Sequence, residues 1–442
     1  MAQAARIAME RLKYCLLIVG LALVVVQPVE AQPVETVDYS FQRGDTLMGL
    51  AAKYMRRVTD YRIVQRLNRI ADPRSIPVGA IVQIPVALLK YRASSANIAA
   101  YRGNVAVALA GRQLPVAQGM ALAEGSVVAT AANSFVTIRL EDGTLISLPS
   151  NSAVTIGRLR RILLTDSIDH EFAVTSGSMR SRVAPLQRPE DRYRVRTPAA
   201  VSAVRGTDFR NRVDAVNSKS FSETVEGSVD VLAKGSTSAV PVLAGQGAAV
   251  ADDGGLQTAK LLEPPVLVEP AKIQSDAQLR FAAEPGSGSV AWRYLLAADA
   301  GFIDVLAEAR SETAEALLPS LPNGRYFVKA TAFDAAGFEG LPVVYGFKRV
   351  LSTLSASADA TDFGYRFAWQ GEGSGVRRYH FQLLRGSKDA LAMVDEPGLE
   401  GDNIILSDLP PGEYYWRVGI TQFADGERTQ KWGDFEKLNI SE

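Results

Sequence analysis

Few residues in this 442-residue chain have the types and spacings that support catalysis or metal binding. Its two histidines, His170 and His380, are too few for a histidine-based metal site and lie far apart in sequence. Asp166 and Asp169 have no glutamate at the spacing of a calcium loop, and 252–255 (Asp-Asp-Gly-Gly) is typical of a loop. No serine lies in a Gly-x-Ser-x-Gly elbow. We therefore predict no catalytic residues, no metal site and no cofactor.

A second candidate for function is a basic, arginine-rich stretch between residues 158 and 196. It has two interpretations: a solvated face of a β-rich region, or a surface that contacts an anionic envelope polymer. Within it, His170 stands between Asp169 and Glu171 and is expected to be a polar loop or edge residue rather than a ligand. The arginines of the stretch are Arg158, Arg160, Arg161, Arg180, Arg182, Arg188, Arg192, Arg194 and Arg196.

Length and composition indicate an ordinary globular chain with about three or four domains. Hydrophobic residues make up 47% and charged residues 22% of the sequence. Lys+Arg and Asp+Glu both number 48, so the net charge favours no nucleic-acid partner. The single cysteine, Cys15, lies in a segment that we expect to be removed, which leaves no disulfide in the mature protein.

The N-terminus has the pattern of a secretory signal peptide. Arg6, Arg11 and Lys13 precede an apolar run from Tyr14 to Val26, and 29–31 (Val-Glu-Ala) fits a cleavage site. The run is short for a membrane helix, which needs about 20 residues. We predict a signal peptide at residues 1–31, with an uncleaved membrane anchor as the alternative.

Residues 36–90 predict a small unit with the order strand, helix, helix, strand. A strand at Val37–Phe41 precedes a helix that begins near Leu47, capped by Asp45 or Thr46. A second helix from Asp60 to Asn68 precedes a turn at 72–75 and a strand at Ile81–Pro85. The residues expected to face inward from the second helix are Ile63, Val64 and Leu67.

This unit resembles a LysM domain, a small module that binds peptidoglycan and chitin. The matching positions are Tyr39, Phe41, Gly44 to Leu47, Leu50-Ala51, Leu67-Asn68, Ile76, Val78-Gly79 and Ile84-Pro85. The resemblance implies that chains containing N-acetylglucosamine lie in a shallow groove, where backbone groups bond the acetamido groups and apolar side chains carry the sugar faces. It assigns glycan binding to Gly44, Asp45, Thr46, Leu47, Met48, Ile70, Ala71, Asp72 and Pro73. Among these, Met48 stands where many members carry a larger or polar residue.

Residues 96–262 predict an all-β domain of many short strands. The expected strands include Asn104–Leu109, Ser126–Ala129, Phe135–Leu140 and Thr144–Leu148, and 141–143 forms a hairpin turn. Such a pattern is typical of a sandwich or of a β-solenoid of stacked rungs, and the sequence does not choose between them.

The middle of this block, Val195–Phe209, predicts a strand, a Pro turn, a strand and a Gly turn. Val201 and Ala203 should face one side, and Ser202 and Val204 the other. Gly206 can adopt the positive φ of a tight reversal. Thr207 and Asp208 can bond turn amides, and Val229 and Val231 should form the apolar face of a further strand.

The run Arg196-Thr-Pro-Ala-Ala-Val-Ser-Ala-Val-Arg-Gly-Thr-Asp-Phe209, with 225–231 and 243–247, resembles the FecR-like periplasmic domain. The resemblance covers roughly residues 96–250. It implies a non-catalytic β module, found in regulators of sigma factors and in other envelope proteins.

Residues 263–442 predict two similar β-domains, at 263–350 and 351–442, after a stiff linker marked by 263–265 and 269–270. Leu321–Val328 matches Leu409–Trp416, and Ala291-Trp292 matches Ala368-Trp369, which gives a repeat of roughly 88 residues. Both halves resemble immunoglobulin-like, fibronectin type III-like sandwiches. In such folds the tyrosine of the Leu-Pro-x-Gly-x-Tyr segment anchors a corner and the tryptophan fills the core.

Together these features predict a mainly β, multidomain, exported and non-catalytic protein of the periplasm or cell wall. Its expected partners are peptidoglycan or another N-acetylglucosamine polymer and an unidentified envelope protein, with no nucleic acid, and with a membrane only if the N-terminal segment is uncleaved. The alternative is a periplasmic sensory protein related to FecR-type regulators. About a dozen residues precede the apolar run, too few for a cytoplasmic sigma-binding domain. A wall hydrolase would need a catalytic domain that the sequence does not show.

Overall fold

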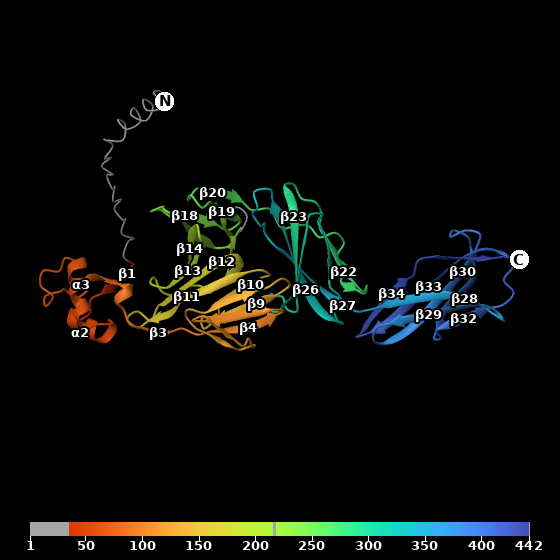
Figure 1. Cartoon of the computed structure of the whole chain (residues 1–442), viewed down its shortest axis with the longest axis horizontal. Helices are drawn as coiled ribbons and strands as arrows, with labels where there is room; N and C mark the ends of the chain where they lie inside the picture. The colour runs from red at the N-terminus through yellow and green to blue at the C-terminus, as the bar shows by residue number, and fades with distance from the viewer. Residues whose placement is uncertain (1–34, 215–217, 442) are drawn as a thin grey trace, which may run out of the picture. The chain divides into compact units, whose positions relative to one another are not determined.

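The computed structural model describes residues 35–214 and 218–441, and they are mainly β (Figure 1). The chain divides into two compact units, Met1–Leu89 and Lys90–Glu442. The signal peptide predicted at residues 1–31 lies outside the described residues. Within residues 35–214 and 218–441, no helix is long and apolar enough to cross a membrane.

The first unit contains the two predicted strands, β1 (Thr36–Ser40) and β2 (Ile81–Pro85), and pairs them antiparallel. Between and after these strands lie α2 (Leu47–Tyr54), η1 (Val58–Asp60), α3 (Tyr61–Leu67) and η2 (Val86–Leu88). Val37, Leu47 and Ile84 are almost fully buried and form part of its core.

The inward face of α3 differs from the prediction. Val64 is buried, but Ile63 and Leu67 are about 40% exposed. Asp60 is buried one turn before Val64, and its carboxylate accepts a hydrogen bond from the Arg57 amide at 3.2 Å. Asp60 and Val64 are four residues apart and are both buried, whereas Ile63 and Leu67 remain partly exposed, so Val64 is the apolar residue that α3 contributes to the core.

Strands β3 to β20 form one closed, barrel-like set whose ladders run in two rows. The first row contains β7 (Ala121–Leu122), β4 (Ala96–Arg102), β9 (Phe135–Leu140), β10 (Leu145–Leu148), β12 (Ile168–Arg182), β15 (Asp208–Val213), β16 (Ser220–Glu226), β19 (Gln246–Val250) and β20 (Leu256–Lys260). The second contains β6 (Arg112–Leu114), β5 (Val105–Leu109), β8 (Val127–Thr130), β11 (Ala153–Ile162), β12 again, β13 (Arg192–Arg196), β14 (Ala200–Val204), β17 (Ser228–Ala233) and β18 (Val240–Leu243). The short strand β3 (Tyr91–Ala93) also pairs with β11.

The two rows enclose one hydrophobic core and share the long strand β12. Ile138, Phe172, Val195 and Val229 are fully buried or nearly so within it. The sequence left a sandwich and a solenoid open, and these pairings give two facing rows around a common core rather than stacked rungs. In Figure 1 the first row can be followed from β4 (orange) to β20 (green).

The central motif folds largely as predicted. Ser202 and Val204 are buried while Val201 is partly exposed, and Gly206 has a φ of +110°. A Cβ on Gly206 would lie 2.8 Å from Cα of Pro185, so the turn also needs the missing side chain. Asp208 was predicted to bond turn amides, and this was wrong. Its carboxylate instead accepts two hydrogen bonds from the Arg180 guanidinium, at 2.8 and 2.6 Å.

The C-terminal part contains two further pairs of sheets. The first sandwich has β21 (Ile273–Gln274), β27 (Val343–Arg349), β26 (Gly324–Asp334), β23 (Ser289–Ala297) and β24 (Val305–Ser311) in one sheet, and β22 (Leu279–Ala282) with β25 (Glu315–Leu318) in the other. The second has β28 (Thr353–Thr361), β29 (Gly364–Glu372) and β32 (Asn403–Leu406) facing β31 (Ala392–Leu399), β30 (Val376–Arg385), β33 (Gly412–Ala424), β34 (Glu427–Trp432) and β35 (Glu436–Ile440).

Both predicted tyrosine corners are present. The Tyr326 hydroxyl donates to the Pro322 carbonyl at 3.1 Å, and the Tyr414 hydroxyl donates to the Pro410 carbonyl at 2.7 Å. The tryptophan match was wrong, although Trp292 and Trp369 are both buried.

The strand pairings show why the two tryptophans do not correspond. Trp292 lies on β23 and pairs with Ala332, six residues after the corner Tyr326. The residue six positions after Tyr414 pairs with Tyr379 on β30, so Tyr379 takes the place of Trp292. Trp369 lies instead on β29, in the opposite sheet of the second sandwich.

The predicted linker at 263–270 packs against the first sandwich instead of standing free. The Leu262 carbonyl accepts from the Leu341 amide at 2.8 Å, and the Pro270 carbonyl accepts from the Tyr345 hydroxyl at 2.7 Å. Leu262 and Leu267 contact the apolar core of the sandwich.

A buried ion network joins the barrel to the first sandwich. Arg210 contacts Glu223 at 3.1 Å and Glu339 at 3.1 Å, and Arg293 contacts Glu339 at 3.3 Å. Arg212 lies 3.7 Å from Glu223, and Arg293 lies 2.6 Å from Glu308. These three arginines and three glutamates, which we call the buried ion network, are each at most 16% exposed in their side chains.

The network reaches beyond its ion pairs. The Glu339 amide donates to Glu223 Oε1 at 2.8 Å, and the Thr331 hydroxyl donates to Glu339 Oε1 at 2.7 Å. Burial alone would raise the pKa of Glu339, but Arg210 and Arg293 outweigh it and hold that pKa below its ordinary value. Glu339 is therefore ionised, and its negative charge is neutralised by Arg210 from the barrel and Arg293 from the sandwich.

His170 is a core residue of β12, not the predicted loop or edge residue. It is fully buried, and its Nε2 lies 3.1 Å from the Ser94 hydroxyl oxygen. Nδ1 is buried without a hydrogen-bond partner among the described residues. Burial lowers the pKa of His170, because a charged ring would lose its hydration and gain no acceptor at Nδ1.

Replacing Glu339 with glutamine should destabilise the protein by about 3–5 kcal/mol, since Arg210 and Arg293 would then be buried with too little negative charge. Urea unfolding of Glu339→Gln against wild type measures this. Glu400→Gln removes an exposed glutamate that pairs with Arg378 and should cost at most about 1 kcal/mol. Equal losses in the two variants would contradict the assigned importance of the network.

The thermal stability of the protein should fall as the pH drops below about 6.5, the ordinary pKa of histidine. The lowered pKa of His170 means that the unfolded chain takes up this proton first. The contribution is therefore present above pH 6.5 and is lost below it, by up to about 1.4 kcal/mol per pH unit. Melting of wild type and His170→Gln between pH 8 and 5 should show a shallower slope for the variant, and identical slopes would contradict this.

Candidate functional site

The loop before α2 is shaped by Asp45. Its carboxylate accepts hydrogen bonds from the Tyr39 hydroxyl and from the Gln42 amide, both at 2.8 Å. Gly44 has a φ of +91°, and a Cβ there would meet nothing within 4 Å. Burial and the Asp45 charge raise the pKa of Tyr39 to about 12, so its phenol stays protonated and keeps donating. The loop is thus fixed by its own side chains and leaves its backbone open at Gly44.

Thr46 is the residue that caps α2, the second of the two predicted alternatives. Its φ is −132°, and its hydroxyl accepts from the Gly49 amide at 2.9 Å. The cap places Leu47 in the core, where it is 1% exposed, and turns Met48 outward, where it is 55% exposed. Of these two predicted glycan residues, Met48 offers a side chain to a ligand, and Leu47 offers only its backbone.

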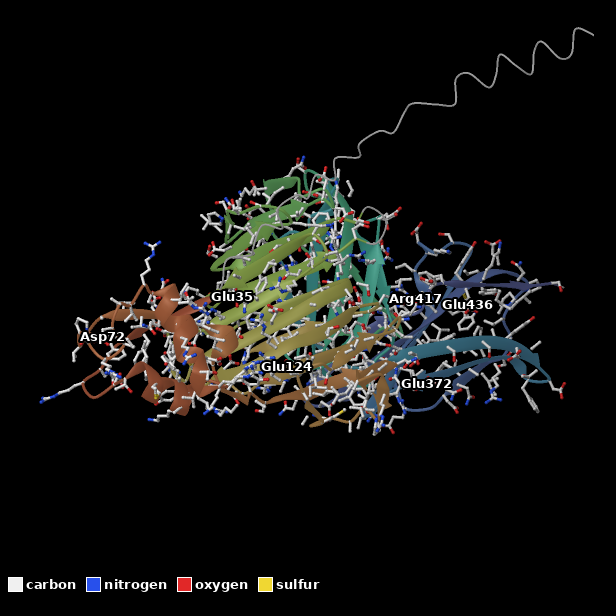
Figure 2. All side chains as sticks on the ribbon, turned by 60° about the vertical axis from the view of Figure 1, so that its left-hand side comes forward. Glu35, Asp72, Glu124, Glu372, Arg417 and Glu436 are labelled. Atoms are coloured by element: carbon white, nitrogen blue, oxygen red, sulfur yellow. The ribbon has the colours of Figure 1, made fainter. Side chains whose placement is uncertain are left out.

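The other predicted wall follows α3. Ala71 and Asp72 are exposed, and Ile70 and Pro73 are half-buried. Asp72, labelled in Figure 2, accepts hydrogen bonds from the Arg74 amide at 2.9 Å and from the Ser75 hydroxyl at 3.2 Å. These bonds keep its carboxylate turned toward its own turn.

The Asn68 side chain holds the end of α3 in place, a role that was not predicted from the sequence. Its side-chain amide donates to the Val64 carbonyl at 2.8 Å and to the Gln83 carbonyl at 2.7 Å, and its Oδ1 accepts from the Gln83 amide at 2.7 Å. The side chain therefore pins the end of α3 to β2. An asparagine directly after a helix was the available signal, since asparagine commonly bonds nearby backbone groups.

The basic stretch is not a free cationic surface. Asp169 pairs with Arg194 at 2.8 Å and with Arg158 at 3.3 Å, and Glu171 pairs with Arg196 at 2.9 Å. Further ion pairs join Arg160 to Glu124, Arg161 to Glu141, Arg180 and Arg182 to Asp208, and Arg188 to Asp166. Acidic residues on neighbouring strands and turns thus neutralise most of the stretch, which weakens the interpretation as a polymer-binding surface.

Two family models match the chain. The LysM domain model matches residues 39–85, which contain the capped loop, both helices and β2. The FecR protein model matches residues 126–230, the middle of the barrel from β8 to β17. A search of curated proteins gives no significant match.

Three solved structures match parts of this chain at low sequence identity. A structure assigned as an anti-sigma factor from Parabacteroides distasonis is 17% identical with a TM-score of 0.25, and the match covers 30% of this chain and 59% of that one. The FN1–FN3 domains of chicken CNTN1 are 16% identical with a TM-score of 0.20, covering 55% and 95%. The fibronectin(III)-like modules of Clostridium thermocellum CbhA are 14% identical with a TM-score of 0.20, covering 40% and 94%.

LysM domains bind glycans that contain N-acetylglucosamine, and both matched families are non-catalytic binding or regulatory domains typical of envelope proteins. This mainly β chain therefore carries a LysM domain at residues 39–85 and a FecR domain matched at residues 126–230.

Proposed function

We propose that this protein is exported to the cell envelope, where it binds peptidoglycan without catalysis and presents its β-rich part to a protein partner. The match of residues 39–85 to the LysM domain carries the proposal. We further propose a signal peptide at 1–31, a glycan-binding domain at 36–90, a FecR-like domain at 96–262 and sandwich domains at 263–350 and 351–442.

Glycan binding would use backbone groups of the two loops and one exposed apolar side chain. The peptide groups around Gly44, Asp45 and Thr46 would form hydrogen bonds with the acetamido groups of the glycan. The peptide groups of residues 70–73 would do the same from the other wall of the groove. Met48 would lie against a sugar face, since an exposed thioether side chain gains from covering apolar surface. Other exposed apolar residues of this unit could extend the contact, namely Ile63, Leu67, Val78 and Ile81.

The remainder of the chain suits a scaffold. The buried ion network and the bond from the Thr137 hydroxyl to the Ile303 carbonyl, 2.8 Å long, hold the barrel and the first sandwich together. One LysM module is expected to bind weakly, and repeated sites on one polymer would raise the effective affinity. A rigid β-rich part that is covalently linked to a weak glycan-binding domain fits a protein that holds partners near the wall.

Met48→Asp should weaken co-sedimentation of the full chain with insoluble peptidoglycan by at least about ten-fold in Kd, or about 1.4 kcal/mol. The substitution places a charge where a sugar face would lie, and Met48 is exposed enough for the fold to tolerate it. The matched control is Met393→Asp, since Met393 is 49% exposed on β31.

Wild-type binding with a loss only in Met48→Asp supports the groove. Equal binding by both variants would remove Met48 from the site. Retention of binding by residues 90–442 alone would move wall attachment out of the LysM domain, because that fragment is a separate compact unit.

A periplasmic sensory role is the second candidate, favoured by the FecR match at residues 126–230. It predicts that deletion of the gene changes transcription of a sigma-factor-dependent operon. Export of residues 90–442 to the periplasm should then restore the wild-type transcript level. A scaffold role predicts defects that only the full chain repairs, with those transcripts unchanged.

A further inference from the structure

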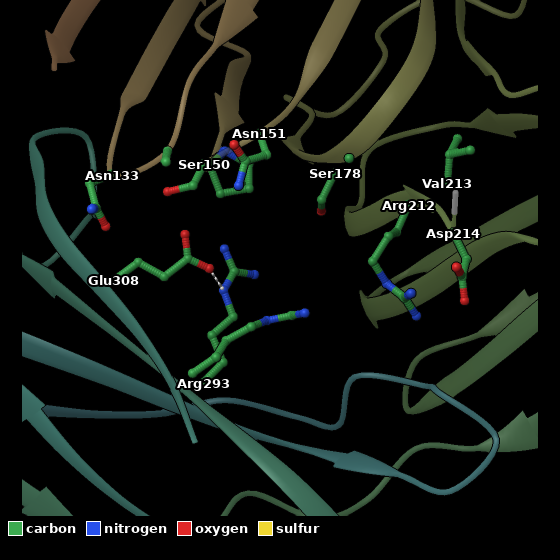
Figure 3. Close-up of a pocket in the computed structure, with 13 residues that line it drawn as sticks. Asn133, Ser150, Asn151, Ser178, Arg212, Val213, Asp214, Arg293 and Glu308 are labelled. Atoms are coloured by element: carbon green, nitrogen blue, oxygen red, sulfur yellow. Dashed lines mark hydrogen bonds and ion pairs between the residues drawn. The ribbon is translucent and has the colours of Figure 1, made fainter. Parts of the chain in front are cut away.

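A cleft of about 480 Å³ lies where the barrel meets the first sandwich (Figure 3). Ser150 and Asn151 line it from the barrel loop between β10 and β11. Arg293 and Glu308 extend into it from the neighbouring strands β23 and β24 of the first sandwich. The walls therefore combine hydroxyl, amide, carboxylate and guanidinium groups from two parts of one compact unit.

Two of the three arginines in this cleft are already paired. Arg293 bonds Glu308 at 2.6 Å, and Arg212 lies 3.7 Å from Glu223 and donates to the Gly337 carbonyl. Arg310 differs, because its guanidinium has no hydrogen bond or ion pair with any residue that the structure describes, although its backbone pairs with Arg293. Its guanidinium lies 4.6 Å from the centre of the Phe333 ring, a contact that orients it without neutralising it.

A smaller cavity of about 240 Å³ shares Arg212 and Arg310 with the cleft. Its other walls are mainly apolar and include Trp292 and Phe333. The two arginines thus stand at the boundary between a polar and an apolar space. This arrangement suits a ligand that carries an anionic group beside a face without charge.

The charges around Arg310 favour an anion. Desolvation and then the positive charge of Arg293 lower the pKa of Arg310, and Arg212 adds to this effect, although Glu339 and Glu308 act in the opposite direction. A bound oxyanion would offset that repulsion. Guanidinium groups also bind carboxylate and phosphate oxygens in pairs, which gives geometric selectivity for such groups.

We propose that this cleft binds a small acidic sugar, with its carboxylate or phosphate group between Arg310 and Arg212. Its hydroxyl groups would bond Ser150 and Asn151, and its uncharged face would lie toward the smaller cavity. The site is separate from the LysM loops and does not depend on glycan binding there.

Isothermal titration of the full chain tests the site with three probes. N-acetylmuramic acid carries a carboxylate, N-acetylglucosamine 6-phosphate carries a phosphate, and N-acetylglucosamine is neutral. We expect at least one acidic probe to bind more tightly than the neutral sugar, and Arg310→Gln to weaken that probe at least ten-fold. Arg112→Gln makes the same charge change at an exposed position on β6 and should leave binding unchanged.

The preferred acidic probe identifies the anionic group. Absence of binding by both acidic probes, or equal binding by wild type and Arg310→Gln, overturns the proposal, and so does an equal loss in Arg112→Gln. If Arg310→Gln lowers the melting temperature, Ser150→Ala replaces it, because the Ser150 hydroxyl has no hydrogen-bond partner among the described residues and its loss should spare the fold. Unchanged affinity in Ser150→Ala would then count against the site.

Discussion

The salt bridges of Arg210 to Glu223 and Glu339 are the interaction on which the β-rich part depends. Arg210 and Glu223 belong to adjacent barrel strands, and Glu339 comes from the first sandwich. A buried ion that loses its partner is costly, so each side of this junction stabilises the other. The barrel and the first sandwich should therefore behave as one body, in spite of the boundary that the sequence predicts between them.

Most arginines of the basic stretch pair with carboxylates of neighbouring strands, so the barrel presents little net positive charge there. The free guanidinium of Arg310 lies instead at the junction with the sandwich. The proposed site for wall attachment is instead the LysM domain, which exposes Met48 in the first turn of α2 and Ala71 after α3.

Features that depend on local chemistry were predictable from the sequence. The cap on α2, the positive φ of Gly206 and the corners at Tyr326 and Tyr414 each involve residues a few positions apart. The barrel strands at 135–140 and 145–148 also follow from alternation and a turn.

Features that depend on distant residues were not predictable. Glu339 meets Arg210 across 129 positions, and no local pattern marks that pair. The burial of His170 follows from the path of β12 through the core, and the exposure of Ile63 and Leu67 depends on how α3 packs within its unit. Trp292 and Trp369 shared a dipeptide but lie on strands that do not correspond.

Amide hydrogen exchange of the full chain, with and without a soluble oligomer of N-acetylglucosamine, tests the central claim most directly. Binding at the LysM loops predicts slower exchange in peptides that cover residues 44–48 and 70–73, with the barrel and sandwich strands unchanged. Protection confined to residues 90–442, or no protection under conditions where the oligomer binds, would contradict the claim that the LysM domain holds the glycan.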